Sequence, residues 1–330
     1  MTAAGQVQRA TKSAAYAVTR RFSTAPADGR AGIDAQLVKR LIASQFPQWR
    51  SLPVNPVAFD GHDNRTYRLG DAMSVRLPIT AQHALAISKE HEWLPKLAPL
   101  LPVPIPQVIG LGKPGEGYSS PWSVRGWLQG ETADRGHIKD LTCFAQRVAE
   151  FLTSLQRIDA TDGPAAGAHS WQRGASPGYY DDEVQECLAK LEMVPETTPI
   201  DLRALREVWA AALLAKPHRV PVWFHGDVAS GNLLVADGEL AAVIDFGTCG
   251  VGDPACDLVV AWTMLSGESR LAFRQTVAQA PETWARARGW AVWKSLLLLT
   301  ADGARRTSDT YITNVRILKN VIEDHALYGI

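Results

Sequence analysis

The sequence has no excess of charge of either sign, because 34 Lys and Arg residues balance 34 Asp and Glu residues. A chain with zero net charge has no overall basic field to attract nucleic acid or an anionic membrane. It also has no apolar run of the roughly 18 residues that a membrane-spanning helix requires, and its longest candidate, 295–301, is far too short. We therefore expect neither nucleic acid nor a membrane as a partner.

Cysteine is scarce as well. The chain has 4 cysteines with no CxxC pair among them, and no histidines accompany Cys249 or Cys256 at the spacing of metal ligands. This usage predicts a reducing compartment without a disulfide framework, and it argues against a zinc site. What remains is a 330-residue chain with 46% hydrophobic and 21% charged residues, which is long enough for two lobes with separate cores.

Residues 1–32 differ in composition from the rest of the chain. Five Lys and Arg residues stand there against one acidic residue, Asp28, among many Ala, Ser and Thr residues. An Arg-rich, acid-poor start is typical of organelle transit peptides, but it lacks the apolar segment of a secretory signal. A disordered extension is the reading that we favour. We accordingly expect a cytoplasmic protein that folds from residue 33 onward.

Residues 33–128 are expected to form a small lobe rich in strands. Helical spacing of apolar residues from Ile33 gives way to three short β-prone runs, which Gly61 and Gly70 separate. Such runs predict consecutive antiparallel strands. Another helix and a last strand complete this half; the expected helices span 33–42 and 84–100, and the expected strands span 54–59, 64–69, 73–77 and 122–128.

Residues 129–330 are expected to form a larger, mainly helical lobe. Three strand-like runs interrupt the helical spacing and are joined by glycine-containing loops. The two halves predict an α+β bilobal fold that holds a ligand at the lobe junction, with Gly130 as a hinge. The expected helices lie at 138–158, 183–191, 202–214 and from 258 onward, and the strands at 222–225, 232–235 and 240–245.

The chemically informative residues lie at the ends of these three strands. His225-Gly226-Asp227 is separated by four residues from Asn232, and Asp245-Phe246-Gly247 follows. Phosphoryl transfer requires a positioned hydroxyl nucleophile and a magnesium ion held against the phosphates. A carboxylate orients the hydroxyl proton, while an amide oxygen and a second carboxylate suit the hard Mg²⁺ ion. Each of these short motifs alone is commonly a turn, but their joint spacing predicts function.

The same spacing occurs in protein kinases, where the first triplet is His-Arg-Asp. With the run Gly252-Asp-Pro-Ala-Cys-Asp257-Leu downstream, the pattern strongly resembles the aminoglycoside phosphotransferase family. These are small-molecule kinases with a protein-kinase-like fold, and the resemblance extends from about Ile33 to the C-terminus. It implies transfer of the γ-phosphoryl group of ATP or GTP to a substrate hydroxyl.

The resemblance also assigns roles to individual residues. It implies that Asp227 is the catalytic base and that Asn232 and Asp245 bind Mg²⁺. His225 would brace the catalytic loop, and Asp257 would be a buried carboxylate that binds backbone N–H groups of this loop. Asp253 is left out of the catalytic set, because a turn or a helix N-cap explains it equally well.

In the small lobe the match is looser. Members of the family hold the triphosphate with a basic residue on the third strand, oriented by a helix glutamate, and these positions are occupied by Arg76 and Glu90. Arg replaces the Lys of protein kinases, and a guanidinium stays charged and binds phosphate through two hydrogen bonds. An exposed strand arginine is the alternative. Helix phase does not decide between Glu90 and Glu92 as its partner.

The glycine-rich loop of kinases is missing, since residues 60–65 contain one glycine. Asn64 or His62 would contact a phosphate from this shorter loop. The adenine is expected to stack in the cleft and to hydrogen-bond backbone groups of the hinge at 125–128, which places Trp127 and Leu128 at the nucleotide.

For the acceptor, polycationic aminoglycosides call for carboxylates, and the candidates are Asp181, Glu183 and Glu268, followed by Asp182 and Asp302. An acidic run that opens a helix fits the helix dipole equally well. A tryptophan-walled pocket for a larger apolar acceptor such as a macrolide is the other option, although helical spacing favours a core role for Trp262, Trp284, Trp290 and Trp293. The sequence therefore predicts an antibiotic of aminoglycoside type or a related metabolite as acceptor, and a monomer or homodimer.

Two rival classes compete with a kinase. A pseudokinase or nucleotide-binding module would keep the fold without catalysis; the intact site residues argue against it, and the altered Arg76 and short loop argue for it. A metal-dependent hydrolase built on the same aspartates would need a further histidine cluster, but His169 and His218 lie at no ligand-like spacing.

Overall fold

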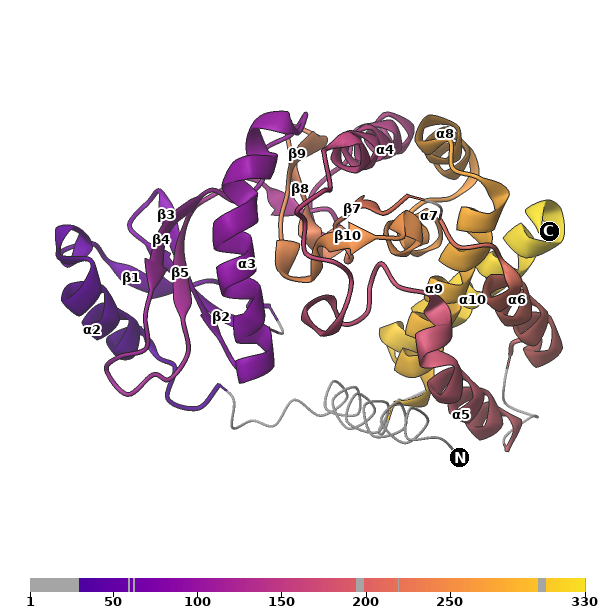
Figure 1. The fold of residues 1–330 in the computed structure, drawn as a ribbon, viewed down its shortest axis with the longest axis horizontal. Coiled ribbons are helices and arrows are strands. Elements are labelled where there is room, and N and C mark those ends of the chain that lie inside the picture. Colours follow the sequence, from indigo (N-terminus) through magenta and orange to yellow (C-terminus); the bar gives the residue numbers. More distant parts are fainter. Residues whose placement is uncertain are drawn as a thin grey trace.

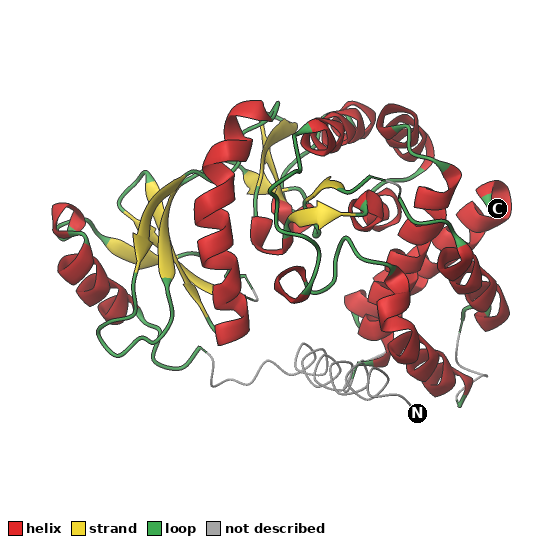
Figure 2. Cartoon of the chain, in the orientation of Figure 1, coloured by secondary structure: helices red, strands yellow, loops and turns green. Residues whose placement is uncertain are grey.

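The computed structural model describes residues 30–58, 60, 61, 63–193, 199–218, 220–301 and 307–329. The expectations for residues 1–29, His62 and Asp302 lie outside these ranges. A strand-rich part and a helical part lie at opposite ends of the molecule, with helix α3 (Ala81–Leu97) between them (Figure 1). The secondary structure in Figure 2 confirms the predicted α+β class.

The strand-rich part is a five-stranded antiparallel sheet in the order β1-β2-β3-β5-β4. Helix α2 (Ala35–Gln45), which the Asp34 side chain caps, supplies the other layer of its core. Trp122 and Tyr67 are the largest side chains between the two layers. The predicted run of antiparallel strands is confirmed, and β4 is a further strand that was not among the expected ones. The bounds are β1 Val54–Pro56, β2 Asn64–Leu69, β3 Met73–Pro78, β4 Val108–Gly112 and β5 Trp122–Gly126.

The helical part is arranged around α9, whose residues are buried on nearly every side. A helix without a polar face belongs in the centre of a core, and α5, α6 and α10 pack against it. Helix α4 shows the amphipathic alternative, with a buried stripe that includes Phe144, Val148 and Leu152. The helices are α4 Leu141–Arg157, α5 Asp181–Glu192, α6 Leu202–Leu214, α7 Val260–Thr263, α8 Gly267–Val277, α9 Pro281–Thr300 and α10 Asp309–Tyr328.

Two small sheets lie within the helical part. Strands β8 (Leu233–Ala236) and β9 (Glu239–Val243) form a hairpin that β6 (Glu131–Thr132) extends, whereas β7 (Val222–Phe224) pairs with β10 (Gly250–Gly252). Strands β6 and β10 are not among the expected strands, because two or three residues carry no readable alternation.

The larger core also takes in Leu94 and Leu97 of α3 and the following Val103 and Ile105. The boundary between residues 128 and 129 therefore stays a prediction, since apolar residues before it already pack in the helical part. None of the described helices is both long and apolar enough to cross a bilayer.

Packing in the sheet core depends on the missing side chain of Gly112, which lies opposite Trp122 in the β4–β5 register. A Cβ atom on Gly112 would overlap the Trp122 ring. We expect Gly112→Ala to lower the free energy of unfolding by about 1–3 kcal/mol through overpacking, measured by urea denaturation. Gly61→Ala is the matched control, because no atom lies within 4 Å of its Cβ position. Equal stability of the two variants would contradict this packing.

Candidate active site

The loop after β7 is held by a buried carboxylate. The backbone N–H groups of His225 and Gly226 donate to Asp257 over 2.8 and 2.6 Å. Asp257 is fully buried, and burial raises the pKa of its carboxyl while the nearby His225 ring and the two N–H donors oppose that rise. Because both bonds are made by backbone groups, the Asp257 side chain fixes the path of the chain just before Asp227.

Gly226 is required at the position where protein kinases have arginine. Its φ of 89° lies in the left-handed region, and a Cβ atom would approach the Thr248 hydroxyl and carbonyl oxygens to 2.8 and 2.9 Å. A larger residue would clash there and would also be strained. The departure from the protein-kinase triplet thus follows from a close approach to Thr248.

The His225 ring connects the two halves of the motif. Its Nδ1 accepts the backbone N–H of Asp227 at 3.2 Å, so Nε2 is free to donate to the Ile244 carbonyl at 3.0 Å. The ring also packs edge-on against Phe246, with centroids 4.6 Å apart. These contacts place the residue before Asp245 beside the loop that carries Asp227.

Asp227, Asn232 and Asp245 are brought together by this frame. The Asn232 amide nitrogen donates to the backbone carbonyl of Asp227 at 2.9 Å and to its carboxylate at 3.0 Å. The Asn232 carbonyl accepts the N–H of Ile244 at 2.9 Å, which places Asp245 next to it. Asp245 adopts a left-handed conformation with φ of 66°, uncommon outside glycine and often found at functional sites.

This donor set fits a hard divalent cation. The two side-chain hydrogen bonds of Asn232 both use Nδ2, which leaves Oδ1 as an acceptor in the same frame as the carboxylates of Asp227 and Asp245. Oxygen ligands of this kind suit Mg²⁺, which is bound by one or two carboxylates together with substrate phosphates.

Arg76 of β3 reaches from the sheet to the same place. Its Nη2 lies 3.0 Å from the Asp245 carboxylate, and its Nη1 lies 3.8 Å from Glu90 on α3. Glu92, the other candidate, is exposed and pairs with Lys96. Glu90 therefore faces Arg76, but its closest partner is Arg125, which binds it with both terminal nitrogens at 2.9 and 2.6 Å.

Helix α3 is fastened to the Asp245-Phe246-Gly247 segment by a buried lysine. The Lys89 ammonium donates to the carbonyls of Gly247 and Cys249 at 2.8 and 2.7 Å. Burial lowers the pKa of Lys89. The glutamate next to it in sequence is thereby kept at a fixed distance from the candidate metal site.

The remaining residues expected at the nucleotide lie at opposite ends of the interior strands. Asn64 pairs with Pro78 at the end of β3, whereas Trp127 follows Gly126, which pairs with Met73 at the start of that strand. Asn64 is buried at the start of β2, and its side-chain oxygen has no hydrogen-bond partner among the described residues. The backbone N–H of Trp127 already donates to Ala72, and its ring stacks on Arg68 at 3.9 Å. A backbone donor for an adenine would therefore have to come from Leu128 rather than Trp127.

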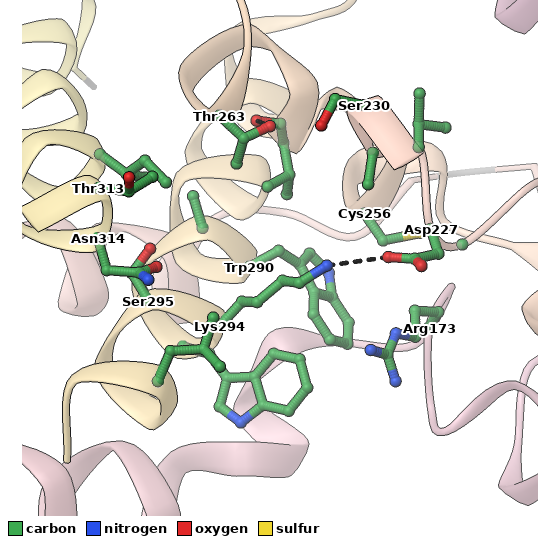
Figure 3. Close-up of a pocket in the computed structure, with 18 residues that line it drawn as sticks. Arg173, Asp227, Ser230, Cys256, Thr263, Trp290, Lys294, Ser295, Thr313 and Asn314 are labelled. Atoms are coloured by element: carbon green, nitrogen blue, oxygen red, sulfur yellow. Dashed lines mark hydrogen bonds and ion pairs between the residues drawn. The ribbon is translucent and has the colours of Figure 1, made fainter. Parts of the chain in front are cut away.

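Two cations next to Asp227 were not predicted from the sequence. The Lys294 ammonium on α9 lies 2.9 Å from the Asp227 carboxylate, and the Arg173 guanidinium lies on another side of it (Figure 3). Burial by itself would raise the pKa of Asp227, but these two cations hold it well below its usual range. Asp227 is accordingly ionised, as a proton acceptor must be. Lys294 follows Asp227 by 67 positions, so no local motif could have indicated it.

A third unpredicted residue is Asp63, in the loop before β2. It lies 3.3 Å from His83, and burial raises the pKa of its carboxyl, with Asp245 adding to the rise. Asp63 precedes Asn64 in the short loop that replaces the glycine-rich one, where the sequence analysis considered only its neighbours.

The carboxylates expected to bind the acceptor lie elsewhere. Asp181 accepts the indole N–H of Trp209 at 2.8 Å, and Glu183 accepts that of Trp293. Glu268 is exposed in the first turn of α8. None of the three lines the cavity beside Asp227, whereas Trp290 and Trp293 do. Asp253 caps the turn that begins at Pro254 and pairs with Arg286.

Comparison with known proteins decides the family. The model of the phosphotransferase enzyme family matches residues 54–290, which is more than half of the chain. The chain belongs to the phosphotransferase enzyme family. The predicted enzyme class, a phosphotransferase, is thus confirmed. No curated protein matches the sequence of this phosphotransferase.

Solved structures show the same fold at low identity. The GDP and kanamycin complex of APH(2″)-IIia is 18% identical, with a TM-score of 0.63, over 87% of this phosphotransferase and 98% of that chain. The streptomycin–ATP ternary complex of APH(2″)-IIa is 18% identical, with a TM-score of 0.57, over 91% and 99%. Macrolide 2′-phosphotransferase MphH from Brachybacterium faecium is 21% identical, with a TM-score of 0.54, over 86% and 97%.

The buried ion pair between Glu90 and Arg125 leads to a prediction about the stability of the fold. Burial alone would raise the pKa of Glu90, but Arg125 and Arg76 lower it below its ordinary value. A lowered carboxyl pKa stabilises the folded state above the ordinary pKa of the unfolded chain, and this stabilisation is lost as the pH falls. Glu90→Gln should lower the free energy of unfolding at neutral pH by about 3–5 kcal/mol and should make the loss on acidification shallower.

The measurement is denaturant unfolding at a series of pH values. Glu92→Gln is the control, because Glu92 is exposed and its pair with Lys96 should contribute within about 0.5 kcal/mol. If Glu90→Gln and wild type lose stability in parallel as the pH falls, the pairing described for Glu90 is wrong.

Proposed function

We propose that this phosphotransferase is a small-molecule kinase that transfers the γ-phosphoryl group of ATP or GTP to a hydroxyl group of a small acceptor. The observation that carries the proposal is the convergence of Asp227, Asn232 and Asp245 within one frame of hydrogen bonds. An ionised carboxylate next to a cluster of oxygen ligands is what phosphoryl transfer to a hydroxyl requires.

The nucleotide is assigned to the side of the site that faces the sheet. Arg76 lies there, within 3.0 Å of Asp245, and a guanidinium suits the β- and γ-phosphates of a triphosphate. The structurally similar proteins include a GDP complex and an ATP complex, which supports a purine nucleotide as donor. Mg²⁺ bound by Asn232 and Asp245 would neutralise charge on the phosphates.

The transfer step follows from the position of Asp227. The acceptor oxygen attacks the γ-phosphorus, and its proton passes to the Asp227 carboxylate. The new O–P bond forms as the bond between the γ-phosphorus and the bridging oxygen breaks, and that electron pair leaves with the nucleoside diphosphate. Asp227 contributes by orienting the hydroxyl and by accepting its proton late in the transfer.

The assigned roles predict different defects in two variants. Asp227→Asn should reduce the transfer rate by about 10²–10⁴-fold while leaving the affinity for Mg·ATP unchanged, because the base is not part of the nucleotide clamp. Asp245→Asn should weaken Mg·ATP binding itself, because it removes a metal ligand. Transfer is measured by phosphate gain of the acceptor in mass spectrometry, and nucleotide affinity by calorimetry.

Asp237→Asn provides the matched control, since Asp237 is an exposed turn residue between β8 and β9. It should behave as wild type in both assays. Equal loss of nucleotide affinity in the Asp227 and Asp245 variants would contradict the division of roles. Unchanged transfer in Asp227→Asn would contradict Asp227 as the base. Binding of Mg·ATP without phosphate gain by any acceptor, already in the wild type, would instead favour a nucleotide-binding module.

A further inference from the structure

The cavity beside Asp227 belongs to the acceptor side of the site. It has a volume of about 240 Å³ and is lined by residues of the helical part, from Arg173 to Ile317, with none from the sheet. Arg76, on strand β3, and Asp245 are not among its lining residues. The cavity beside Asp227 therefore does not include the residues assigned to the nucleotide.

The charge of this cavity is opposite to what a polycationic acceptor requires. Asp227 is the sole carboxylate among the described lining residues, and Arg173 and Lys294 are both cationic. Lys294 is neutralised by Asp227 at 2.9 Å. The Arg173 guanidinium, in contrast, has no hydrogen-bonded or ion-paired partner among the described residues. Its described contact is with the face of Trp293, 5.3 Å from the ring centroid.

The backbone on both sides of Arg173 is held by hydrogen bonds to its loop. The carbonyl of Trp171 accepts the Tyr180 hydroxyl at 2.8 Å, and the carbonyl of Gly174 accepts the Asp253 N–H at 2.7 Å. Both neighbours of Arg173 in the chain, Gln172 and Gly174, have left-handed φ values of 58° and 81°. A guanidinium on such a fixed backbone, stacked on Trp293 and without a hydrogen-bonded carboxylate among the described residues, can bind a carboxylate or phosphate group.

The other residues that line the cavity indicate the chemical character of the rest of the ligand. Trp290 and Trp293 form an aromatic wall, and Leu298 and Ile317 extend it. The indole N–H of Trp290 has no hydrogen-bond partner among the described residues, which adds an unused donor to the lining. The volume is below the roughly 300–1,000 Å³ of ordinary ligand pockets, so it suits a compact molecule.

From these contacts we infer that the acceptor is a compact hydroxyl compound that carries an anionic group, a carboxylate or phosphate, on an apolar or aromatic body. The anion binds Arg173, the apolar body packs on the tryptophans, and the hydroxyl lies at Asp227. This inference rests on the proposed kinase function and narrows its acceptor class. Polycationic aminoglycosides are excluded by it, because they would meet two cations and a single carboxylate.

A matched series of acceptors tests the charge preference. Hydroxymethylbenzoate, hydroxymethylbenzamide and hydroxymethylbenzylamine, substituted at the same ring position, share the hydroxyl and the ring and differ in charge. With saturating Mg·ATP, the benzoate should gain phosphate with a kcat/KM about 10–100-fold above that of the benzamide, because a charge-assisted hydrogen bond replaces a neutral one. The benzylamine should be the poorest acceptor.

The variant Arg173→Met tests whether Arg173 causes the preference for the anionic acceptor. It should raise KM for the benzoate by about 10–100-fold and thereby abolish the preference for the benzoate over the benzamide. Lys190→Met is the control, because Lys190 is exposed on α5 and pairs with Glu186. If Arg173 instead stabilises the transferred phosphoryl group, Arg173→Met will lower kcat equally for all three acceptors, and the inference is wrong.

Calorimetric titration of the full chain with the three compounds, in the presence of Mg·ADP, gives a readout that does not depend on turnover. Tighter binding of the benzoate, lost in Arg173→Met, supports the inference. Binding of the benzylamine as tight as that of the benzoate, or binding of neither, overturns it. Phosphate gain by the benzylamine alone would also overturn it while leaving the kinase function intact, whereas failure to bind Mg·ATP would contradict the kinase function itself.

Discussion

The carboxylate of Asp257 accepts two successive backbone N–H groups, those of His225 and Gly226, in the interior of the helical part. A buried carboxylate without such partners would be costly, and so would the two buried N–H groups. The loop therefore has one path that satisfies all three groups. That path sets where Asp227 points, where Asn232 can bind it, and which side of the loop the cavity opens on.

Around Asp227 the charges divide into two sets that do not overlap. Toward the sheet, Arg76 lies between Glu90 and Asp245, and Lys89 and Arg125 hold this cluster to α3 and β5. Away from the sheet, Arg173 and Lys294 face the cavity. Asp227 belongs to the second set, in which it pairs with Lys294. Under the proposed function, the nucleotide and the acceptor would have separate cationic surroundings.

The parts of the site that are contiguous in sequence could be predicted, and the parts assembled from distant segments could not. The chemistry dictates the spacing from His225 to Asp245, so this spacing can be recognised in the sequence without a structure. The bounds of strand β2 were likewise predicted over its whole length. The sequence could not predict that Arg125 is the main partner of Glu90. The two residues lie 35 positions apart, one on a strand and one on a helix, and neither belongs to a local motif. The same holds for Arg173 and Lys294, which no local pattern relates to Asp227.

The acidic residues at the start of α5 show why a local signal does not fix a residue's role. Asp181 and Glu183 open α5, and a run of acids at a helix N-terminus is compatible both with a cation-binding pocket and with the helix dipole. In the folded protein these two carboxylates accept the indole N–H groups of Trp209 and Trp293. Glu183 thereby orients a ring that lines the cavity and that Arg173 stacks on. Since Trp293 links Glu183 to Arg173, removing this acid would disturb the position of a cation. Glu183 therefore shapes the aromatic wall of the cavity without supplying its charge, whereas Asp181 binds Trp209, which does not line the cavity.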